Sequence, residues 1–301
     1  MVARTPHAEA SRGTLLNRVQ SAEARRWGTD PADFDPEAVR GLRRLLRPVF
    51  GRRGYLRVTV DGWSSVPDAP TLVASNHSGG TWAMDAWGWN YAWTEHFRDA
   101  RPLHTLAHEM VFGVAASGRR LAKVGLLRAE RGRALSVLQD WGRDVYVMPG
   151  GDRDIWRPFS ERYKVCFAGR KGYARLAIKA GVPITPVAHV GAHHTLMVLT
   201  DGKRLARALR LPQLARAEVF PVHLSLPWGV GIGPVLHLPP PVPFRYRIGA
   251  PIPPPVAVAP GEEPPAEAVE AMDEAVRQSI QSMLDALRAE SPWRRRLNRA
   301  A

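Results

Sequence analysis

Residues 71–87, TLVASNHSGGTWAMDAW, constrain the fold more than any other stretch of the sequence. Residues 71–75 are apolar or β-compatible and follow the turn-forming segment VPDAP, so they predict a buried strand. Gly79 and Gly80 then allow the backbone to turn sharply and to approach a ligand closely. From Trp82 onward the pattern is helical. The stretch therefore predicts a strand, a tight glycine turn and a helix in direct succession.

Two residues of this stretch carry side chains suited to proton transfer. His77 lies where the predicted strand ends, and Asp85 falls in the first turns of the predicted helix. An imidazole at a strand end, with a carboxylate beyond a glycine turn, predicts a site for general-base chemistry. A structural interpretation is also open, in which His77 bonds to a backbone carbonyl and Asp85 stabilises a helix N-terminus.

Strands and helices alternate along most of the chain. Besides residues 71–75, we expect strands at residues 56–60, 103–107, 144–148, 182–190 and 243–252. We expect helices from residue 82 onward and at residues 36–50, 111–124, 134–141, 170–180 and 267–290. This pattern predicts an α/β fold with a mainly parallel central sheet flanked by helices and an N-terminal amphipathic helix. Residues 1–31 are expected to be a flexible segment, and residues 32–301 a single domain that includes the C-terminal helix.

The sequence is strongly basic, with 42 lysine and arginine residues against 28 aspartate and glutamate residues and a net charge of +14. Such a charge favours acidic partners, namely phosphorylated substrates, anionic lipid or nucleic acid. Arginine outnumbers lysine, which also fits a compositional bias of the genome. No nucleic-acid-binding motif is recognisable, so nucleic acid is not an expected partner.

Cysteine and histidine usage argues against a metal site. The single cysteine, Cys166, excludes an internal disulfide and a cysteine-based metal cluster. His104, His108 and Glu109 suggest zinc, but the metalloprotease motif requires glutamate directly after the first histidine. We therefore expect no metal. The N-terminus lacks the apolar core of a signal peptide, and the lone cysteine fits a reducing compartment such as the cytoplasm.

Residues 219–244 form the longest run without a charged side chain. The run is long enough to span a bilayer, but its prolines and glycines would interrupt a helix. It is therefore expected to form strand and loop. It is either an apolar surface that touches lipid or lines an acyl pocket, or a buried strand followed by a rigid connection.

Further segments bear on membrane contact. The helix at residues 36–50 has an apolar side with Val39, Leu42, Leu45, Leu46 and Val49, and a basic side with Arg40, Arg43, Arg44 and Arg47. The alternative for this helix is packing on the core with a solvated basic side. The aromatic side chains of residues 82–93 either line the bottom of an acyl tunnel, contact lipid or pack in the core. With the basic tail at residues 293–296, these features predict a cytoplasmic protein bound peripherally to an anionic membrane surface at the inner face of the cell membrane.

Two loops carry side chains suited to phosphate. Arg128, Arg131 and Arg133 can each grip phosphate with two hydrogen bonds, or they form a solvated basic loop. Residues 149–154, PGGDRD, form a glycine-rich, charged turn after the predicted strand at residues 144–148. This turn lacks the lysine and the spacing of a P-loop, which argues against nucleotide hydrolysis.

Four blocks of the sequence, in this order, resemble the lysophospholipid acyltransferase superfamily, which contains the 1-acylglycerol-3-phosphate acyltransferases. They are the strand with Asn76-His77 and Asp85, the loop 125–131, VYVMPGGDRD at residues 145–154 and KGYARLAIKAGVPITPVAHVGA at residues 171–192. The glycine-rich forms are similar to its diacylglycerol-acyltransferase-like branch. The resemblance extends from about residue 55 to residue 254.

Two positions depart from the superfamily pattern. The usual motif has four residues between the histidine and the aspartate, whereas seven lie between His77 and Asp85. Either the glycine turn bulges so that Asp85 still reaches His77, or Asp85 is not its partner. The third block usually reads Pro-Glu-Gly, but here Pro149-Gly150-Gly151 lacks the glutamate, which leaves the carboxylates of Asp152 and Asp154 to replace it.

The resemblance implies an acylglycerophosphate acyltransferase-like fold and transfer of an acyl chain from acyl-CoA or acyl carrier protein to a hydroxyl of a lipid acceptor, such as a lysophospholipid or glycolipid. His77 would be the general base, and Asp85 would hold its tautomer. Backbone N–H groups of Gly79 and Gly80 would stabilise the oxyanion, and arginines would bind phosphate. The remaining residues implied in substrate binding are Arg128, Arg131, Gly150, Gly151, Asp152, Arg153 and Asp154. No cofactor is implied besides acyl-CoA as co-substrate.

Two other functions stay open. A lipid hydrolase or thioesterase would use the same histidine, but no G-x-S-x-G motif occurs, and Ser78 lies directly beside His77. A non-catalytic membrane-lipid-binding protein would need only the positive charge and the apolar segments.

Overall fold

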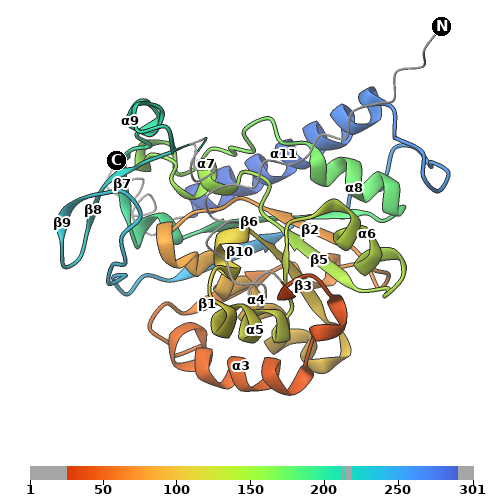
Figure 1. Ribbon diagram of the computed structural model, residues 1–301, viewed down its shortest axis with the longest axis horizontal. Helices are drawn as coiled ribbons and strands as arrows, with labels where there is room; N and C mark the ends of the chain where they lie inside the picture. Colours follow the sequence, from red (N-terminus) through yellow and green to blue (C-terminus); the bar gives the residue numbers. More distant parts are fainter. Residues whose placement is uncertain (1–25, 212, 214–218, 291–301) are drawn as a thin grey trace, which may run out of the picture.

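The computed structural model describes residues 26–211, 213 and 219–290. Its main element is a seven-stranded sheet with the strand order β1-β10-β6-β2-β5-β3-β4 (Figure 1). The strands are β1 Val58–Asp61, β2 Leu72–Ser75, β3 Leu103–Ala107, β4 Leu126–Arg128, β5 Asp144–Val147, β6 Ile184–Val190 and β10 Phe244–Ile248. The five strands from β6 to β4 are parallel, whereas β10 is antiparallel to β6 and parallel to β1. The prediction of a mainly parallel sheet is confirmed.

Helices cover both faces of this sheet (Figure 1). One face carries α6 Arg131–Gln139, α8 Gly172–Ala180 and α11 Ala266–Ala289, and the other carries α3 Pro36–Phe50, α4 Met84–Phe97 and α5 Ala115–Lys123. Side chains of β2 alternate between the two cores, because Leu72 and Ala74 belong to the first and Val73 to the second. The result is the helix, sheet and helix layering of an α/β fold.

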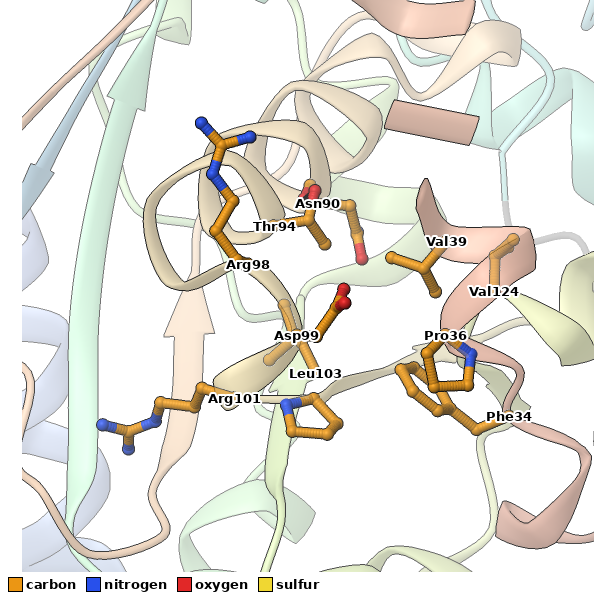
Figure 2. A pocket seen from close by; sticks show the side chains of 11 residues that line it. Phe34, Pro36, Val39, Asn90, Thr94, Arg98, Asp99, Arg101, Leu103 and Val124 are labelled. Carbon is orange, nitrogen blue, oxygen red and sulfur yellow. Dashed lines mark hydrogen bonds between the residues drawn. The ribbon is translucent and has the colours of Figure 1, made fainter. Parts of the chain in front are cut away.

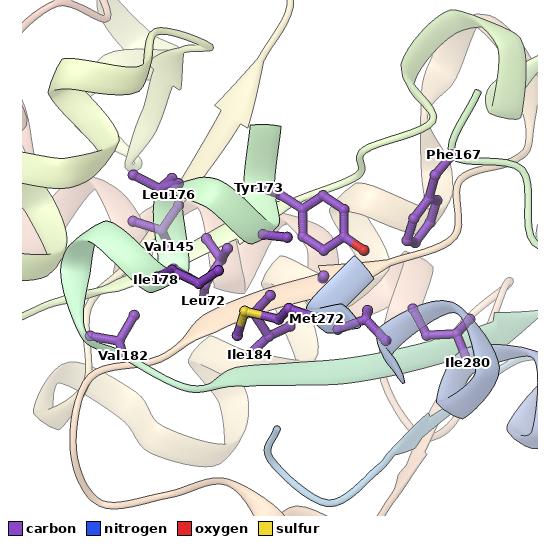
Figure 3. Close-up of a cluster of buried hydrophobic side chains, with 14 of the residues drawn as sticks. Leu72, Val145, Phe167, Tyr173, Leu176, Ile178, Val182, Ile184, Met272 and Ile280 are labelled. Carbon is purple, nitrogen blue, oxygen red and sulfur yellow. The ribbon is translucent and has the colours of Figure 1, made fainter. Parts of the chain in front are cut away.

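The first core holds the C-terminal helix α11 against the sheet. Figure 3 shows Met272 and Ile280 of this helix among Leu72, Val145 and Ile184 of the strands. Residues far apart in the sequence therefore share one core, in which α11 packs against the same face of the sheet as Leu72 of β2.

Aromatic side chains of α4 fill the second core. Trp89 and Trp93 are fully buried with ring centroids 5.9 Å apart, and Trp89 also lies 5.6 Å from the ring of Tyr246. Core packing is therefore the interpretation that the structure supports for these rings. Trp82, which precedes the helix, stays partly exposed.

Predicted boundaries are most accurate where capping residues are present. Helix α3 has its predicted ends, and Asp35 accepts hydrogen bonds from its first turn. Helix α8 has its predicted C-terminal end, because Gly181, with φ 69°, ends it. The predicted helix at residues 111–124 is wrong in detail, since it is divided into the 3-10 helix η5 Glu109–Phe112 and α5. The predicted turn at residues 149–154 is partly helical, because α7 spans Gly151–Ile155.

The N-terminal helix α3 is amphipathic, but two side chains lie opposite to the side predicted for them. Leu45 was expected to face the core and is 71% exposed. Arg43 instead faces α4, where its Nη1 donates to the carbonyl oxygen of Thr94 at 3.0 Å. Arg40 pairs with Asp99 at 2.7 Å. Because α4 and the segment after it supply these acceptors, part of the basic side is neutralised by the protein itself.

A second, three-stranded antiparallel sheet follows β6. It consists of β7 Met197–Thr200, β8 Val222–Ser225 and β9 Gly229–Ile232, and α9 Lys203–Ala208 follows β7 (Figure 1). Residues 219–244 thus form strand and loop, as predicted, whereas β7 was not predicted. In the described ranges, no helix combines the length and the apolar character needed to cross a membrane.

Of the segment expected to be flexible, residues 26–31 are described. There the carbonyl oxygen of Gly28 accepts a hydrogen bond from the Arg128 amide at 2.8 Å. The earlier part of that segment, and the basic tail at residues 293–296, lie outside the described residues.

Leu72 tests the importance of the central strand, because it is fully buried in the first core. Leu72→Ala leaves a cavity that β2, paired on both sides, cannot close. We expect it to lower the free energy of unfolding by about 2–5 kcal/mol. The matched control Leu45→Ala, on the exposed side of α3, should change it by less than about 0.5 kcal/mol. Urea unfolding of both variants measures the difference, and equal effects would contradict the central placement of β2.

Candidate active site

His77 lies two residues beyond the end of β2, at the edge where the parallel strands end and where β5 and β6 flank β2. Asn76, between them, extends the pairing with β6. Its Nδ2 donates to the carbonyl oxygen of His189 at 3.0 Å, and its Oδ1 accepts from the His189 amide at 2.9 Å. Ligands of open α/β sheets usually bind at this edge. The strand order therefore places His77 at a position suited to a site.

His77 and Asp85 are in contact despite their long spacing. His77 Nδ1 lies 2.7 Å from Asp85 Oδ2, and Asp85 is fully buried. The turn closes this distance because Gly79, Gly80 and Ala83 have positive φ angles of 97°, 67° and 46° around the 3-10 helix η3 Gly80–Trp82. Of the two alternatives for the long spacing, the structure shows the bulged turn.

Packing as well as backbone geometry requires Gly79 and Gly80. A Cβ atom on Gly80 would lie 2.3 Å from Leu196 Cδ2 and 3.0 Å from the Trp156 ring, and one on Gly79 would lie 3.3 Å from Ala192 Cβ. Both glycines are buried. Their part in stabilising an oxyanion stays a prediction, because the contacts seen here are with the protein.

A second histidine, His189 on β6, also contacts Asp85. Its Nε2 lies 3.0 Å from Asp85 Oδ2 and 2.9 Å from the carbonyl oxygen of Asn76. Both neighbours are acceptors, so Nε2 carries the proton, and Nδ1 is buried with no hydrogen-bond partner in the described chain. The Ser78 amide donates to the same Oδ2 at 2.8 Å. Sequence reasoning missed His189. The signal that could have identified it is the presence of a histidine inside a strand predicted to be buried.

Asp154 of α7 holds the backbone of the same turn. Its Oδ2 accepts from the amide of His77 at 2.7 Å, and its Oδ1 pairs with Arg157. Arg157 Nη2 in turn lies 2.7 Å from His193 Nε2, and all these side chains are buried. Asp154 therefore contacts the main chain of His77 and not its ring, so it positions the turn and does not compete with Asp85.

The other residues of the third block lie beside this network. Asp152 pairs with Arg170 at 2.7 Å. Gly150 and Gly151 approach neighbouring atoms closely, and a Cβ on Gly151 would lie 2.3 Å from Arg170 Nη1. Arg153 is partly buried in α7. Substrate contacts of these four residues of the block remain predictions.

The surroundings of the pair set its protonation. Burial alone would raise the pKa of Asp85, but the charge of His77 and the hydrogen bonds from His189 and His77 outweigh this and hold that pKa well below its usual range. Burial would lower the pKa of His77, but the charge and hydrogen bond of Asp85 raise it above its ordinary value. Asp85 is therefore ionised, and it favours a protonated imidazole at His77.

Arg128 and Arg131 occupy different environments. Arg128 is buried, donates from Nε to the carbonyl oxygen of Trp27 at 2.9 Å and lies 3.5 Å from Glu109. Binding phosphate would require its guanidinium to leave these contacts. Arg131 is exposed at the first residue of α6. Because β4 is three strands away from β2, Arg128 lies on the order of 14 Å from β2 across the sheet.

The two histidines that suggested zinc, His104 and His108, contact other parts of the protein. Burial lowers the pKa of His104 to about 4, and its ring centroid lies 5.3 Å from that of Phe34. His108 Nδ1 accepts from the Met110 amide at 3.2 Å. Among the residues that the structure describes, no group of three or more histidine, cysteine, aspartate or glutamate side chains is placed to hold a metal ion.

A hollow between α3, the end of α4 and β3 is separate from this site. Figure 2 shows Val39, Asn90, Thr94, Asp99 and Leu103 among the side chains that line it. Its lining contains neither His77 nor Asp85 nor a described hydrogen-bond partner of their side chains. We therefore do not assign it to the substrate.

A family model described as Acyltransferase matches residues 57–190. The matched segment contains β1 to β6 and with them His77, Asp85, Asp154 and His189. This part of the chain is therefore similar to acyltransferases, in agreement with the predicted resemblance to lysophospholipid acyltransferases.

Several known proteins are similar to this chain. An uncharacterized protein of Mycobacterium tuberculosis is 31% identical over 228 residues, which are 75% of this chain and 60% of that protein. An uncharacterized protein of Mycobacterium leprae is 28% identical over 92% of this chain and 71% of its own length. A protein of Gallus gallus described as a DGAT1/2-independent enzyme synthesizing storage lipids is 27% identical over 64% of this chain and 51% of its own. The chain spans about 60% of the length of the first of these relatives.

Among solved structures, the 1-acyl-sn-glycerophosphate acyltransferase PlsC of Thermotoga maritima is similar with a TM-score of 0.47. The sequences are 19% identical, and the match covers 84% of this chain and 80% of that one.

The charge of Asp85 should control the titration of His77. We expect Asp85→Asn to lower the pKa of His77, because the charge that raises it is lost, whereas Asp152→Asn, which alters a carboxylate outside the pair, should leave it unchanged. NMR titration of the imidazole measures both. The raised pKa also means that the charge of His77 stabilises the fold fully below about pH 6.5 and that this contribution of His77 is lost as the pH rises through the folded value. An unaltered His77 pKa in Asp85→Asn would contradict the contact.

His189 should stabilise the fold through its hydrogen bond to a buried charge. We expect His189→Leu to lower the free energy of unfolding by about 1.5–3 kcal/mol. His189→Gln should recover part of this loss, because its side-chain amide can place a donor near the position of Nε2. Urea unfolding at neutral pH compares the two variants. Equal losses would show that His189 contributes ring packing alone.

Proposed function

We propose that the protein is an O-acyltransferase that moves an acyl chain from acyl-CoA or acyl carrier protein to a hydroxyl of a lipid acceptor, such as a lysophospholipid or glycolipid. The observation that carries the proposal is the buried contact of His77 with Asp85 at the end of the central strand, inside the segment that matches the acyltransferase family. The description of the Gallus gallus relative, an enzyme synthesizing storage lipids, supports a lipid product.

His77 would act through Nε2. Its Nδ1 faces the ionised Asp85 and therefore carries the proton, so the lone pair of the neutral ring lies on Nε2. About a tenth of the His77 side chain is exposed, and the proposed substrate would reach the ring there. Nε2 would take the proton of the acceptor hydroxyl while the hydroxyl oxygen forms a bond to the thioester carbonyl carbon. Such assistance contributes roughly 10²–10⁴-fold to the rate.

The second half of the reaction returns the proton. When the carbon–sulfur bond breaks, the leaving thiolate takes the proton from Nε2, and His77 becomes neutral again. Asp85 holds the ring in the correct tautomer and stabilises its cation between the two steps. We assign the backbone N–H groups of Gly79 and Gly80 to the oxyanion, and Arg131 and Arg153 to phosphate on the acceptor or on CoA. His77 supplies the proton transfer, so the proposal includes no metal or redox cofactor.

The proposal places the reaction at a membrane surface on the cytoplasmic side, where a soluble thioester donor meets a lipid acceptor. Its support is the net charge of +14, which attracts anionic lipid headgroups. Each basic residue close to such a surface contributes about 1 kcal/mol.

Hydrolysis is the competing function, in which His77 would activate water or a serine. Ser78 is buried, and its amide is bonded to Asp85, so this serine is part of the turn that holds the carboxylate. Release of CoA that depends on an acceptor hydroxyl distinguishes transfer from hydrolysis.

An acyl-CoA assay against lysophospholipid and glycolipid acceptors, with products identified by mass, tests the function. We expect His77→Ala to lower transfer by about 10²–10⁴-fold while a thermal melt shows that the variant is still folded at the assay temperature, and Asp85→Asn to lower transfer by a similar order. The control His194→Ala, which alters an exposed histidine outside the network, should keep the wild-type rate. Wild-type turnover in His77→Ala, or CoA release that is equally fast without acceptor, would overturn the proposal.

A further inference from the structure

The outer face of the β7-β8-β9 sheet is apolar. Met197 pairs with Leu224, and Leu224 pairs with Val230, so these three exposed side chains form one row across the sheet. The neighbouring row, Val198 and His223, is buried on the inner face. Other large apolar side chains extend the exposed row, namely Leu199, Leu226, Trp228, Ile232, Leu236 and Leu238. We call these nine residues the apolar sheet face.

The apolar sheet face differs from the usual antiparallel sheet, in which every second side chain is polar and points to the solvent. Val230 is 68% exposed and Trp228, in the turn between β8 and β9, is 63% exposed. Such a contiguous apolar surface marks an interaction site when it occurs in a folded protein.

Charge around the face indicates the chemistry of its partner. Residues 219–244 contain no aspartate, glutamate, lysine or arginine. Next to β7, α9 and the residues after it carry Lys203, Arg204, Arg207 and Arg210, of which Lys203 pairs with Asp201 at 2.5 Å. Leu205 and Leu209 are exposed among these cations. An apolar surface with a basic margin and a tryptophan in the hairpin turn matches an anionic bilayer, whose headgroups are negative and whose interior is apolar.

The face is attached directly to the turn that carries His77. Thr81 Oγ1 donates to the carbonyl oxygen of Val235 at 2.9 Å, and Trp82 Nε1 donates to that of His237 at 2.7 Å. Trp228 Nε1 donates to the carbonyl oxygen of Leu236 at 2.6 Å, which folds the hairpin turn onto the same segment. A lipid held against this face would therefore lie next to the η3 turn between His77 and Asp85.

The basic helix α3 is the less suitable membrane contact. Figure 1 shows the small sheet and α9 at one side of the molecule, away from α3. Arg40 and Arg43 of α3 are occupied by Asp99 and by the end of α4, and its exposed leucine, Leu45, stands apart from the apolar sheet face.

We propose that the apolar sheet face, with the basic residues of α9 at its margin, docks the protein on a bilayer that contains anionic lipid. The proposal rests on the proposed function for the choice of lipid as partner. Docking orients the His77 edge of the main sheet toward the surface that holds the acceptor.

Co-sedimentation with phosphatidylcholine vesicles, with and without phosphatidylglycerol, tests the docking without any acyl donor. We expect the double variant Val230→Thr and Ile232→Thr, which keeps β-compatible side chains, to bind anionic vesicles about tenfold more weakly. Arg204→Gln and Arg207→Gln should each weaken binding about fivefold, only when phosphatidylglycerol is present. Leu45→Gln on α3 is the matched control and should bind as the wild type does.

A second measurement does not depend on the double variant folding. Tryptophan fluorescence of the wild type should be quenched by vesicles with brominated acyl chains, and Trp228→Phe should lose a large part of this quenching. Equal binding of the double variant and the wild type, or quenching unchanged in Trp228→Phe, would overturn the proposal. So would a dimer in solution that the double variant abolishes while vesicles are not bound, because the face would then join two copies of this chain.

Intact vesicle binding without acyl transfer would overturn the proposed function alone, and transfer to a short-chain soluble acceptor without vesicle binding would overturn the docking alone.

Discussion

The buried carboxylate of Asp85 is the group on which the site depends. A charge removed from water persists only when hydrogen bonds and opposite charge compensate it, and Asp85 receives them from the His77 ring, the Ser78 amide and the His189 ring. These donors belong to the turn after β2 and to the adjacent strand β6. Tyr246 of β10 donates to the Asp85 carbonyl oxygen at 2.7 Å. Asp85 thus joins the turn and β6 through its carboxylate, and β10 through its main-chain carbonyl group.

The two departures from the superfamily pattern meet at His77. The long glycine turn brings Asp85 against the ring, and the altered third block brings Asp154 against the amide of His77. Arg157 compensates the second carboxylate and connects it to His193. His77 is therefore held by one buried carboxylate through its side chain and by another through its backbone. Such support from both sides limits the movement of an imidazole that must meet a substrate at a defined distance.

The same turn connects the main sheet to the small one. Gly80 packs against Leu196 and Trp156, and the Trp156 ring stacks over His223 on the inner face of the small sheet. The ring of Trp156 therefore lies between the turn and the inner face of the small sheet. If the two proposals hold, a lipid acceptor reaches His77 from the side of the molecule that touches the bilayer, and the charged parts of the donor approach from water.

The sequence alone determined the central strand, the ends of α3, the C-terminal end of α8, the mainly parallel sheet and the choice of His77 and Asp85 as candidate residues, because local periodicity, capping residues and motif order report on neighbours along the chain. Only the tertiary structure decided that the turn bulges enough to join this pair, that His189 and Asp154 complete it, and that Arg43 of α3 faces the protein. The physical reason is that a buried polar group is satisfied by whichever donors the strand order brings to it. Those donors come from strands and helices far apart in the sequence, so no local pattern specifies them.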